Sequence, residues 1–462
     1  MQIKIPELSL VILVGVTGCG KSTFAKKHFK PTEIVSSDHC RALICDDENN
    51  QHVTKAAFEV LNFIAAKRLE AGKLTVIDAT SVQIEARKSL RALARKYHVP
   101  SAAIVFNLPE RLCHEGNKYR SDRQVWPAVI HQQYIDFKEF LDNLPRERFK
   151  HITILNSVAE INAVEIKRIP LSNNLKHERG PFDIIGDVHG CFDELTDLLK
   201  KLGYTIKQSP NFSKENVSLE LPPSSQGKFR EDLDFTVYTV THPEKRQVIF
   251  VGDLIDRGPK NPEVLRLVMD MVATGIAFCV LGNHDVKFMR KLKGKNVNLT
   301  HGLAKTVEQM AKVSPQFNQQ ALEFIENLVD HYLFDGGKLV VAHAGMQEQL
   351  QGRVSGKVRE FALYGQTTGK VDEFGLPERY NWAADYQGQA MVVYGHTPVA
   401  EAKWLNNTIC IDTGNVFGGK LTALRYPEKE LVSVPAKYTY YESPKPFFPS
   451  GALAPPFKAV EK

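Results

Sequence analysis

The chain has 462 residues, of which 43% are hydrophobic and 24% are charged, and its formal net charge is +6. This length exceeds what one hydrophobic core usually organises, so two globular domains are expected. Seven cysteines without a C-x-x-C pair argue against a disulfide framework and against a structural zinc site. We find no signal-peptide pattern and no apolar run long enough to span a bilayer, and therefore expect a cytoplasmic protein.

The net charge is unevenly placed. Residues 1–170 carry all of the +6, whereas the charges of residues 171–462 cancel. Two interpretations stay open, because a basic domain can attract a polyanion or can simply carry a solubilising surface.

Apolar strands alternate with helical patterns through the first part of the chain. Strands are expected at 8–14, near 34, at 74–77, 102–106 and 152–155, with helices from 21, over 56–69 and over 124–141. Such alternation predicts a parallel sheet covered by helices on both faces, in a domain over residues 1–170. The pattern lapses over 171–181, which we interpret as a linker.

A phosphate-binding motif comes directly after the first of these strands. Residues 15–22 read G-x-x-x-x-G-K-S and open a helix, which is the context that the motif requires. Gly15, Gly18 and Gly20 let backbone N–H groups turn toward phosphate, Lys21 adds a cation, and the Ser22 hydroxyl can hold Mg²⁺. The motif predicts binding of ATP with Mg²⁺, although enzymes that hydrolyse nucleotides for motion or signalling use the same loop.

Two further segments favour a kinase. Asp38, just after the second strand, can accept the proton of an attacking hydroxyl, and Arg41 can hold an anionic acceptor. Asp38 could instead cap a helix. Asp78, at the end of a later strand, could either cap the next helix or orient the magnesium-binding hydroxyl. Arg120 and Arg123 precede a helix and are typical of a lid that neutralises a transferring phosphoryl group, which tips the balance toward catalysis. Alone, that segment would be a solvated basic turn.

The second part of the chain starts a new set of strands at residue 182, with a polar excursion over about 208–245. Five apolar strands there each end in a motif of metal-binding residue types. Two divalent cations sharing one carboxylate can clamp a phosphate and activate water. The predicted ligands are Asp187, His189 and Asp253 for one metal, and Asp253, Asn283, His343 and His396 for the other.

Three neighbouring residues complete the predicted site. Arg257 suits bidentate phosphate binding, and His284 can protonate a leaving oxygen. Asp256 is expected to hold the His284 ring. We assign this phosphatase domain to residues 182–440, with a Pro-rich tail after it over 441–462.

Together these residues resemble the bacterial polynucleotide kinase-phosphatase family, which heals nucleic-acid ends. The resemblance implies an α/β protein: a P-loop kinase domain with a parallel sheet, and then a calcineurin-like α/β/β/α metallophosphoesterase domain. It implies ATP-dependent phosphorylation of 5′-hydroxyl ends, with Asp38 activating the hydroxyl and Arg41 holding the neighbouring phosphate. It also implies removal of 3′, 2′ or 2′,3′-cyclic phosphates with manganese or nickel, and Asp412 as a support of the metal site.

The resemblance extends to partners, and it has two departures. Nucleic-acid ends are the expected partners, RNA ahead of DNA, together with a separate ligase, since no ligase-like module comes after the phosphatase motifs. A further lid arginine is expected where this chain has Gly116. A competing hypothesis makes the N-terminal domain a nucleotide-binding module that regulates a phosphatase for proteins or dinucleoside polyphosphates.

Overall fold

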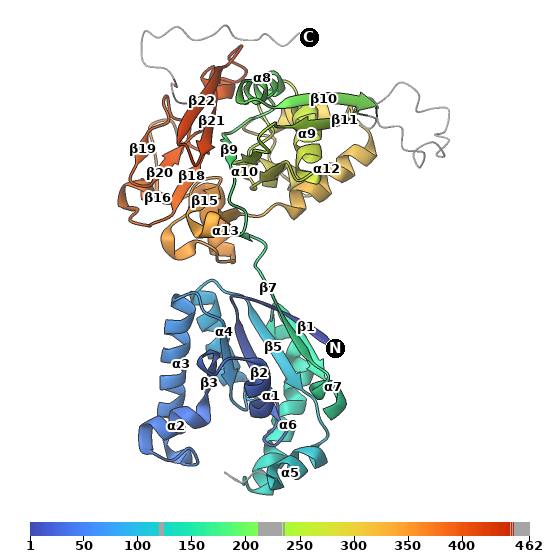
Figure 1. The fold of residues 1–462 in the computed structure, drawn as a ribbon, viewed down its shortest axis with the longest axis vertical. Coiled ribbons are helices and arrows are strands. Elements are labelled where there is room, and N and C mark those ends of the chain that lie inside the picture. Colours follow the sequence, from blue (N-terminus) through green and yellow to red (C-terminus); the bar gives the residue numbers. More distant parts are fainter. Residues whose placement is uncertain (120–123, 211–232, 234–235, 444, 446, 448–462) are drawn as a thin grey trace, which may run out of the picture. The chain divides into compact units, whose positions relative to one another are not determined.

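The computed structural model describes residues 1–119, 124–210, 233, 236–443, 445 and 447. It divides into two compact units, residues 1–171 with 353–356, and residues 172–352 with 357–462. Figure 1 shows that each unit is built around its own sheets. Among the helices of the described residues, none is both long enough and apolar enough to cross a membrane.

The first unit contains a five-stranded parallel sheet in the order β3-β4-β2-β5-β6. A separate parallel pair joins β1 to β7. The elements are β1 (Gln2–Pro6), β2 (Leu10–Val14), α1 (Lys21–His28), β3 (Ile34–Ser36), α2 (Ser37–Cys45), α3 (Thr54–Glu70), β4 (Thr75–Asp78), α4 (Ile84–Lys96), β5 (Ser101–Phe106), α5 (Glu110–Lys118), α6 (Pro127–Asn143), β6 (His151–Leu155), α7 (Val158–Asn162) and β7 (Glu165–Ile169). The parallel sheet predicted from the alternation of strands and helices is confirmed.

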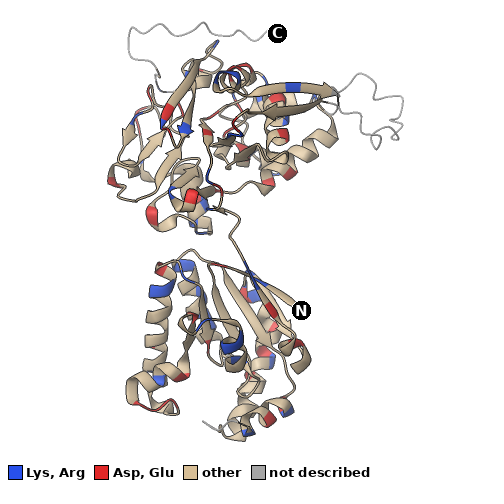
Figure 2. Cartoon of the chain, in the orientation of Figure 1, with Lys and Arg blue, Asp and Glu red and all other residues tan. Residues whose placement is uncertain are grey.

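The central strands of this sheet are apolar because helices cover them. Strand β2 is buried at every position, and Figure 2 shows β2 and β5 free of charged residues. Strands β3 and β4 lie on one side of β2, and β5 and β6 lie on its other side. The strand order therefore reverses at β2, and open α/β sheets bind ligands at the carboxyl end of the strands at such a switch point.

The described residues of the second unit form two large sheets, in the orders β13-β12-β9-β21-β22 and β19-β20-β18-β15-β14-β8, and two two-stranded sheets, β10-β11 and β16-β17. Its helices are α8 (Phe192–Leu202), α9 (Asn261–Ala273), α10 (Asn283–Leu292), α11 (Leu303–Met310), α12 (Pro315–Asn327) and α13 (Gly356–Tyr364). Its strands are β8 (Asn174–Leu175), β9 (Phe182–Ile185), β10 (Thr205–Pro210), β11 (Thr236–Thr241), β12 (Gln247–Phe250), β13 (Ala277–Cys279), β14 (His331–Phe334), β15 (Leu339–Ala342), β16 (Thr367–Val371), β17 (Pro377–Arg379), β18 (Met391–Tyr394), β19 (Trp404–Leu405), β20 (Thr408–Cys410), β21 (Lys420–Tyr426) and β22 (Glu430–Pro435).

Residue alternation along the inner strands builds the layers of this unit. In β9, Ile184 packs between the two sheets, whereas Ile185 packs in the cluster that includes residues of α8 and α9. In β15, Val341 faces the first sheet and Val340 packs in the cluster with residues of α13. This period of two gives a helix–sheet–sheet–helix order, the α/β/β/α arrangement that was expected.

A buried ion network ties β9 to its neighbours just before the predicted metal ligands begin. The Asp183 carboxylate, fully buried in β9, accepts hydrogen bonds from Arg246 Nε at 3.1 Å and from the Tyr204 hydroxyl at 2.9 Å. Arg246, itself 2% exposed, also donates to Glu428 at 2.8 Å. Arg425 adds a longer contact to Asp183 at 3.3 Å.

We expect Arg246→Ala to lower the free energy of unfolding of the second unit by about 3 kcal/mol, because the buried Asp183 carboxylate loses the guanidinium that neutralises most of its charge. Urea unfolding of the full chain, monitored by the fluorescence of buried Trp382, measures this change. Arg290→Ala, the same substitution at an exposed position of α10, serves as the control. Equal stability of the two variants would contradict the assigned role.

Candidate active site

The ends of the parallel strands in the first sheet of the second unit bring three predicted ligands together. Ile185, Phe250 and Cys279 are in register at the ends of β9, β12 and β13. Asp187, Asp253 and Asn283 come after these strands within two to four positions. Their side chains therefore meet at one edge of the sheet.

The second sheet supplies two further ligands from β15 and β18, which end just before His343 and two positions before His396, whereas His189 follows β9 of the first sheet. The two sheets approach closely at Gly395, where an added Cβ would lie only 1.9 Å from Asp187 Oδ1. The backbone N–H of His396 donates to Asp187 Oδ2 at 3.1 Å. A glycine is needed there because the loop lies directly on the carboxylate.

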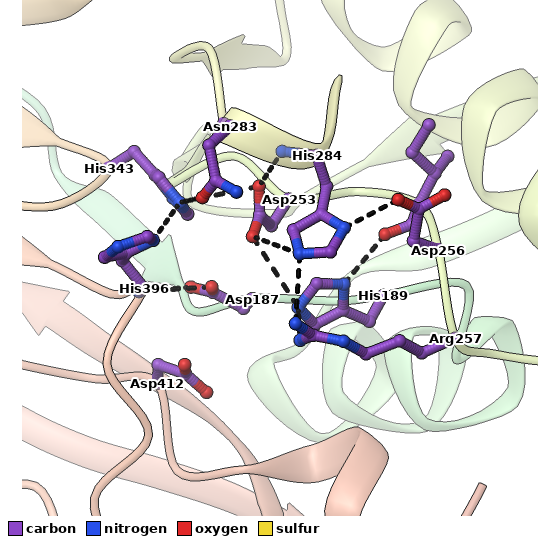
Figure 3. A network of polar contacts seen from close by, with 12 residues as sticks. Asp187, His189, Asp253, Asp256, Arg257, Asn283, His284, His343, His396 and Asp412 are labelled. Atoms are coloured by element: carbon purple, nitrogen blue, oxygen red, sulfur yellow. Dashed lines mark hydrogen bonds and ion pairs between the residues drawn. The ribbon is translucent and has the colours of Figure 1, made fainter. Parts of the chain in front are cut away.

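The predicted ligands of one metal converge on His343 Nε2 (Figure 3). This atom lies 2.9 Å from Asn283 Oδ1, 3.0 Å from His396 Nδ1 and 3.4 Å from Asp253 Oδ1. An amide oxygen, a carboxylate and two imidazoles form a donor set that suits a divalent transition metal.

The second group gathers around the other oxygen of Asp253. His189 Nε2 lies 3.7 Å and His284 Nε2 3.9 Å from Asp253 Oδ2, and the ligand atoms of these three residues all lie within 4.8 Å of one another. Asp187, predicted as a ligand here, stands beside this group with its carboxylate on the His396 backbone. Asp253 thus belongs to both groups of ligand atoms, and its role as a bridging carboxylate stays a prediction.

Hydrogen bonds orient the histidines for metal binding. His189 Nδ1 lies 2.7 Å from the Ile255 carbonyl, and His343 Nδ1 lies 3.0 Å from the Val251 carbonyl. Because a carbonyl oxygen only accepts, each Nδ1 carries the proton and each Nε2 turns a lone pair toward the site. Burial lowers the pKa of His189 and of His396 well below the usual range, so both rings are held neutral, as metal ligands require.

Burial acts on the carboxylates as well. Burial first, and then the charges of Asp412 and Asp253, raise the pKa of Asp187 well above its usual range. Burial also acts to raise the pKa of Asp253, but His343 and His284 hold the pKa of that carboxylate well below its usual range. The residues present therefore fit a pair of divalent cations, which would stabilise the ionised form of these buried acids.

The three residues predicted for phosphate binding and proton transfer also meet at this site. Arg257 donates from Nη1 to His189 Nε2 at 2.7 Å and from Nη2 to His284 Nε2 at 3.0 Å. Asp256 Oδ2 lies 2.6 Å from His284 Nδ1. Thr306 on α11, which the sequence analysis missed, donates its hydroxyl to the other oxygen of Asp256. Fifty positions separate Thr306 from Asp256, and no local motif marks it.

Five residues in these loops adopt left-handed backbone. His189, Asp253, Asp256, Arg257 and His396 all have positive φ, between 47° and 75°. Side chains rarely adopt this conformation unless the surrounding structure enforces it, and such positions cluster at functional sites.

The first unit holds a separate cavity of about 760 Å³ at the carboxyl end of β2. Gly18 and Gly20 adopt φ of 85° and 92° in the loop that lines it. Lys21 Nζ donates to the carbonyls of Gly15 at 2.8 Å and Val16 at 3.0 Å. The loop thus has the left-handed glycines and the lysine that phosphate binding needs.

Polar side chains from the neighbouring strands line the same cavity. The Ser22 hydroxyl is hydrogen-bonded to the Asp78 carboxylate, and burial raises the pKa of Asp78. Asp38 and Arg41 also line the cavity and are ion-paired with each other. Ser36, not Asp38, caps α2, because its side chain accepts from the backbone N–H of His39.

Gly116, where a lid arginine was expected, packs directly on the phosphate-binding loop. A Cβ at Gly116 would lie 2.2 Å from the Gly18 carbonyl oxygen, so no side chain fits there. The other two lid candidates, Arg120 and Arg123, lie outside the described residues. The close approach of α5 to the loop is therefore the physical reason for this departure.

Two family models match the chain: an AAA domain over residues 10–140 and a calcineurin-like phosphoesterase over residues 180–412. The chain is 43% identical over 271 residues to bis(5′-nucleosyl)-tetraphosphatase PrpE [asymmetrical] of Anoxybacillus flavithermus, covering 58% of this chain and 99% of that relative. The Bacillus subtilis protein of the same name is 41% identical over 266 residues, covering 57% and 97%. A solved structure of a candidate diadenosine tetraphosphatase aligns at 23% identity with a TM-score of 0.38, covering 57% of this chain and 96% of that one.

These relatives correct the expected function. A nucleic-acid end-healing enzyme, with polynucleotide 5′-hydroxyl kinase and 3′-phosphatase activities, was wrong, because the relatives are named for cleavage of bis(5′-nucleosyl) tetraphosphates. The expected partners, nucleic-acid ends with RNA ahead of DNA and a separate ligase, are wrong for the same reason. The physical reason is that the metal ligands and Arg257 act on phosphate groups and do not identify the organic groups attached to them.

The fused architecture inferred from the motifs stands, although the polynucleotide kinase-phosphatase family itself is not confirmed. A P-loop domain precedes a calcineurin-like phosphoesterase domain, and each family model covers the motifs of its own unit. By the match over residues 180–412 and the similarity to nearly full-length relatives, this chain belongs to the calcineurin-like phosphoesterase family.

Proposed function

We propose that this chain is a metal-dependent hydrolase of dinucleoside polyphosphates that cleaves a bis(5′-nucleosyl) tetraphosphate asymmetrically. The similarity at 43% identity over 99% of a relative named for that activity carries the proposal. The site supports it, since two groups of ligands share Asp253 beside a phosphate-binding arginine. Manganese is the proposed metal, because the mixed imidazole and oxygen donor set accepts it.

The reaction is hydrolysis at a terminal phosphorus atom of the tetraphosphate. Metals held by the two groups of ligands around Asp253 would supply Lewis-acid activation of the phosphate and of water. Arg257 binds the oxygens of the phosphate under attack. In its doubly protonated form, with Arg257 on the phosphate and no longer on Nε2, His284 donates the Nε2 proton to the leaving nucleoside triphosphate while Asp256 holds the Nδ1 proton. Water supplies the new P–O bond, so diadenosine tetraphosphate gives AMP and ATP.

The first unit is proposed to bind ATP with Mg²⁺. Lys21 would hold the phosphates, and Ser22, oriented by Asp78, would hold the metal. Asp38 and Arg41 line the same cavity, so their place beside the nucleotide stays a prediction. This arrangement corresponds to the competing hypothesis, a nucleotide-binding module joined to a phosphatase.

The activity is tested by incubating the full chain with diadenosine tetraphosphate and MnCl₂ and separating the products by anion exchange. We expect equal amounts of AMP and ATP. Asp253→Asn should lower kcat/KM about a thousandfold, corresponding to about 4 kcal/mol of lost transition-state stabilisation, because both metals lose their shared ligand. Lys21→Ala, in the other unit, is the control with unchanged rate. Two molecules of ADP, or no cleavage, would contradict the proposal.

The proton-transfer chain is tested with Asp256→Asn, which keeps the size of the side chain and tolerates the φ of 75° at this position. We expect kcat to fall about 10- to 100-fold while the bound metal stays constant, because the His284 ring loses its charged partner. Steady-state kinetics and elemental analysis of bound manganese measure the two effects. Glu308→Gln, an exposed change on α11, is the control. Loss of the metal in place of kcat would contradict this role.

Nucleotide binding by the first unit is tested with a fluorescent ATP analogue and MgCl₂. We expect Lys21→Ala to weaken binding about 10- to 100-fold, since a charge-assisted hydrogen bond contributes about 1.5–3 kcal/mol. The exposed Lys88→Ala on α4 should bind like the unmodified chain. Equal binding by both variants would show that the cavity does not hold the phosphates as proposed.

A further inference from the structure

The two hydrogen bonds that hold Arg257 use atoms that the reaction needs for other purposes. Its Nη atoms donate to Nε2 of His189 and to Nε2 of His284 (Figure 3). The first of these nitrogens is a predicted metal ligand, and the second carries the proton for the leaving group in the proposed reaction. Among the described residues, the buried Nε of Arg257 has no hydrogen-bond acceptor. A guanidinium that binds phosphate therefore needs other contacts to hold it in place.

Two aromatic rings lie beside this guanidinium. Its central carbon, Cζ, is 5.1 Å from the centre of the Phe417 ring and 5.8 Å from the centre of the Tyr441 ring. Both distances lie within the range of a cation–π interaction, which attracts a cation to the face of a ring and needs no hydrogen-bond acceptor. The two ring centres are 6.4 Å apart, so Phe417 and Tyr441 form an aromatic pair at Arg257.

The members of the aromatic pair come from different parts of the chain. Phe417 ends the short 3₁₀ helix Asn415–Phe417, in the loop between β20 and β21. Tyr441 lies beyond β22 and is the first residue of the segment that the sequence analysis assigned to a Pro-rich tail. The backbone N–H groups of Tyr440 and Tyr441 donate to the Val416 carbonyl at 3.0 and 3.1 Å. These two hydrogen bonds fix the segment directly beside Phe417.

A buried carboxylate fixes the same segment to α8. Glu194 accepts hydrogen bonds from the Tyr440 hydroxyl at 2.7 Å and from the backbone N–H of Lys437 at 2.9 Å. The Nζ of Lys437 also lies 2.8 Å from Asp197, which is nearly one turn further along this helix. The position of residues 437–441 therefore follows from buried contacts with the helix that comes just after the His189 loop.

Two glycines leave room for a third ring at the loop of Phe417. A Cβ at Gly414 would lie 2.3 Å from Cζ of Phe447, and a Cβ at Gly419 would lie 2.8 Å from its Cε1. The ring centres of Phe447 and Phe417 are 6.2 Å apart. The chain beyond β22 therefore packs two aromatic side chains against the loop that presents Phe417 to Arg257.

We propose that Phe417 and Tyr441 position the Arg257 guanidinium for phosphate binding, and that the segment after β22 is thereby part of the active site. The faces of the rings attract the cation and leave its N–H donors to the phosphate oxygens. Tyr441 acts through Arg257 and is therefore a positioning residue. The inference rests on the part of the proposed function in which Arg257 binds the phosphate under attack, whichever phosphoester the chain cleaves.

The experiment measures the cleavage of two substrates by the full chain with MnCl₂. Diadenosine tetraphosphate is the proposed substrate, and bis(p-nitrophenyl) phosphate is a simple phosphodiester. We expect Tyr441→Leu to lower kcat/KM about tenfold on both, because the guanidinium that binds the attacked phosphate loses one of its two ring contacts. Tyr441→Phe keeps the ring and should retain kcat/KM within about twofold. Tyr438→Leu, the same change at an exposed tyrosine of this segment, should behave like the unmodified chain.

A double variant separates positioning from packing. If Tyr441 acts through Arg257, Tyr441→Leu should change kcat/KM less than about twofold in a chain that already carries Arg257→Gln. Bound manganese, measured by elemental analysis, should be the same in Tyr441→Leu and in the unmodified chain, because the substitution removes no predicted ligand. A ring that only supported the fold would lower the activity of both backgrounds by the same factor.

The outcomes for the inference and for the proposed function can be told apart. Cleavage of the diester without cleavage of the tetraphosphate overturns the proposed function, and the diester rates then decide the inference. The inference alone is wrong if Tyr441→Leu is as active as the unmodified chain, if Tyr441→Phe loses as much as Tyr441→Leu, or if the loss persists beside Arg257→Gln. Loss of manganese from Tyr441→Leu would also overturn it. A chain that cleaves neither substrate overturns both.

Discussion

The sharing of one carboxylate by two groups of ligands is the constraint on which the phosphoesterase site depends. Asp253 is buried, has a φ of 48°, and accepts the backbone N–H of His284 at 2.9 Å. Its two oxygens face different histidines. The backbone of Gly282 lies directly against that of Asp253, since a Cβ at Gly282 would lie 2.1 Å from the Asp253 nitrogen. The glycine that precedes Asn283 is therefore required by the geometry of Asp253.

The concentration of buried acids makes the site dependent on cations. Burial raises the pKa of Asp412 to about 6 and, with the charge of Asp253, that of Asp285 to about 7. Asp285 is held by the backbone N–H groups of Gly282 and Leu254 and fixes the loop between the ligands. A site that places several carboxylates in a low-dielectric interior binds metal partly because the cations relieve their repulsion.

Much of this architecture could be predicted from the sequence, because strand-ending motifs are local. The strands before Asp187, Asp253 and His343 are short apolar runs, and parallel strands bring the residues at their carboxyl ends to one edge of the sheet. Thr306 could not be predicted, because it reaches the site through a contact with a residue fifty positions away in the sequence. The substrate was predicted wrongly for a related reason: the motif residues bind metal and one phosphate, which phosphomonoesters and polyphosphates share.

The joining of the two units in one chain is consistent with the chemistry of the proposed reaction. Asymmetrical cleavage of diadenosine tetraphosphate releases ATP, and a P-loop with Lys21 and Ser22 is suited to the triphosphate of that product. The presence of a phosphate-binding loop in the same chain as a phosphatase therefore does not require a phosphate acceptor or a nucleic-acid strand. In the proposed function, the ATP released at the site of Asp253 is a ligand of the class that the loop with Lys21 is proposed to bind.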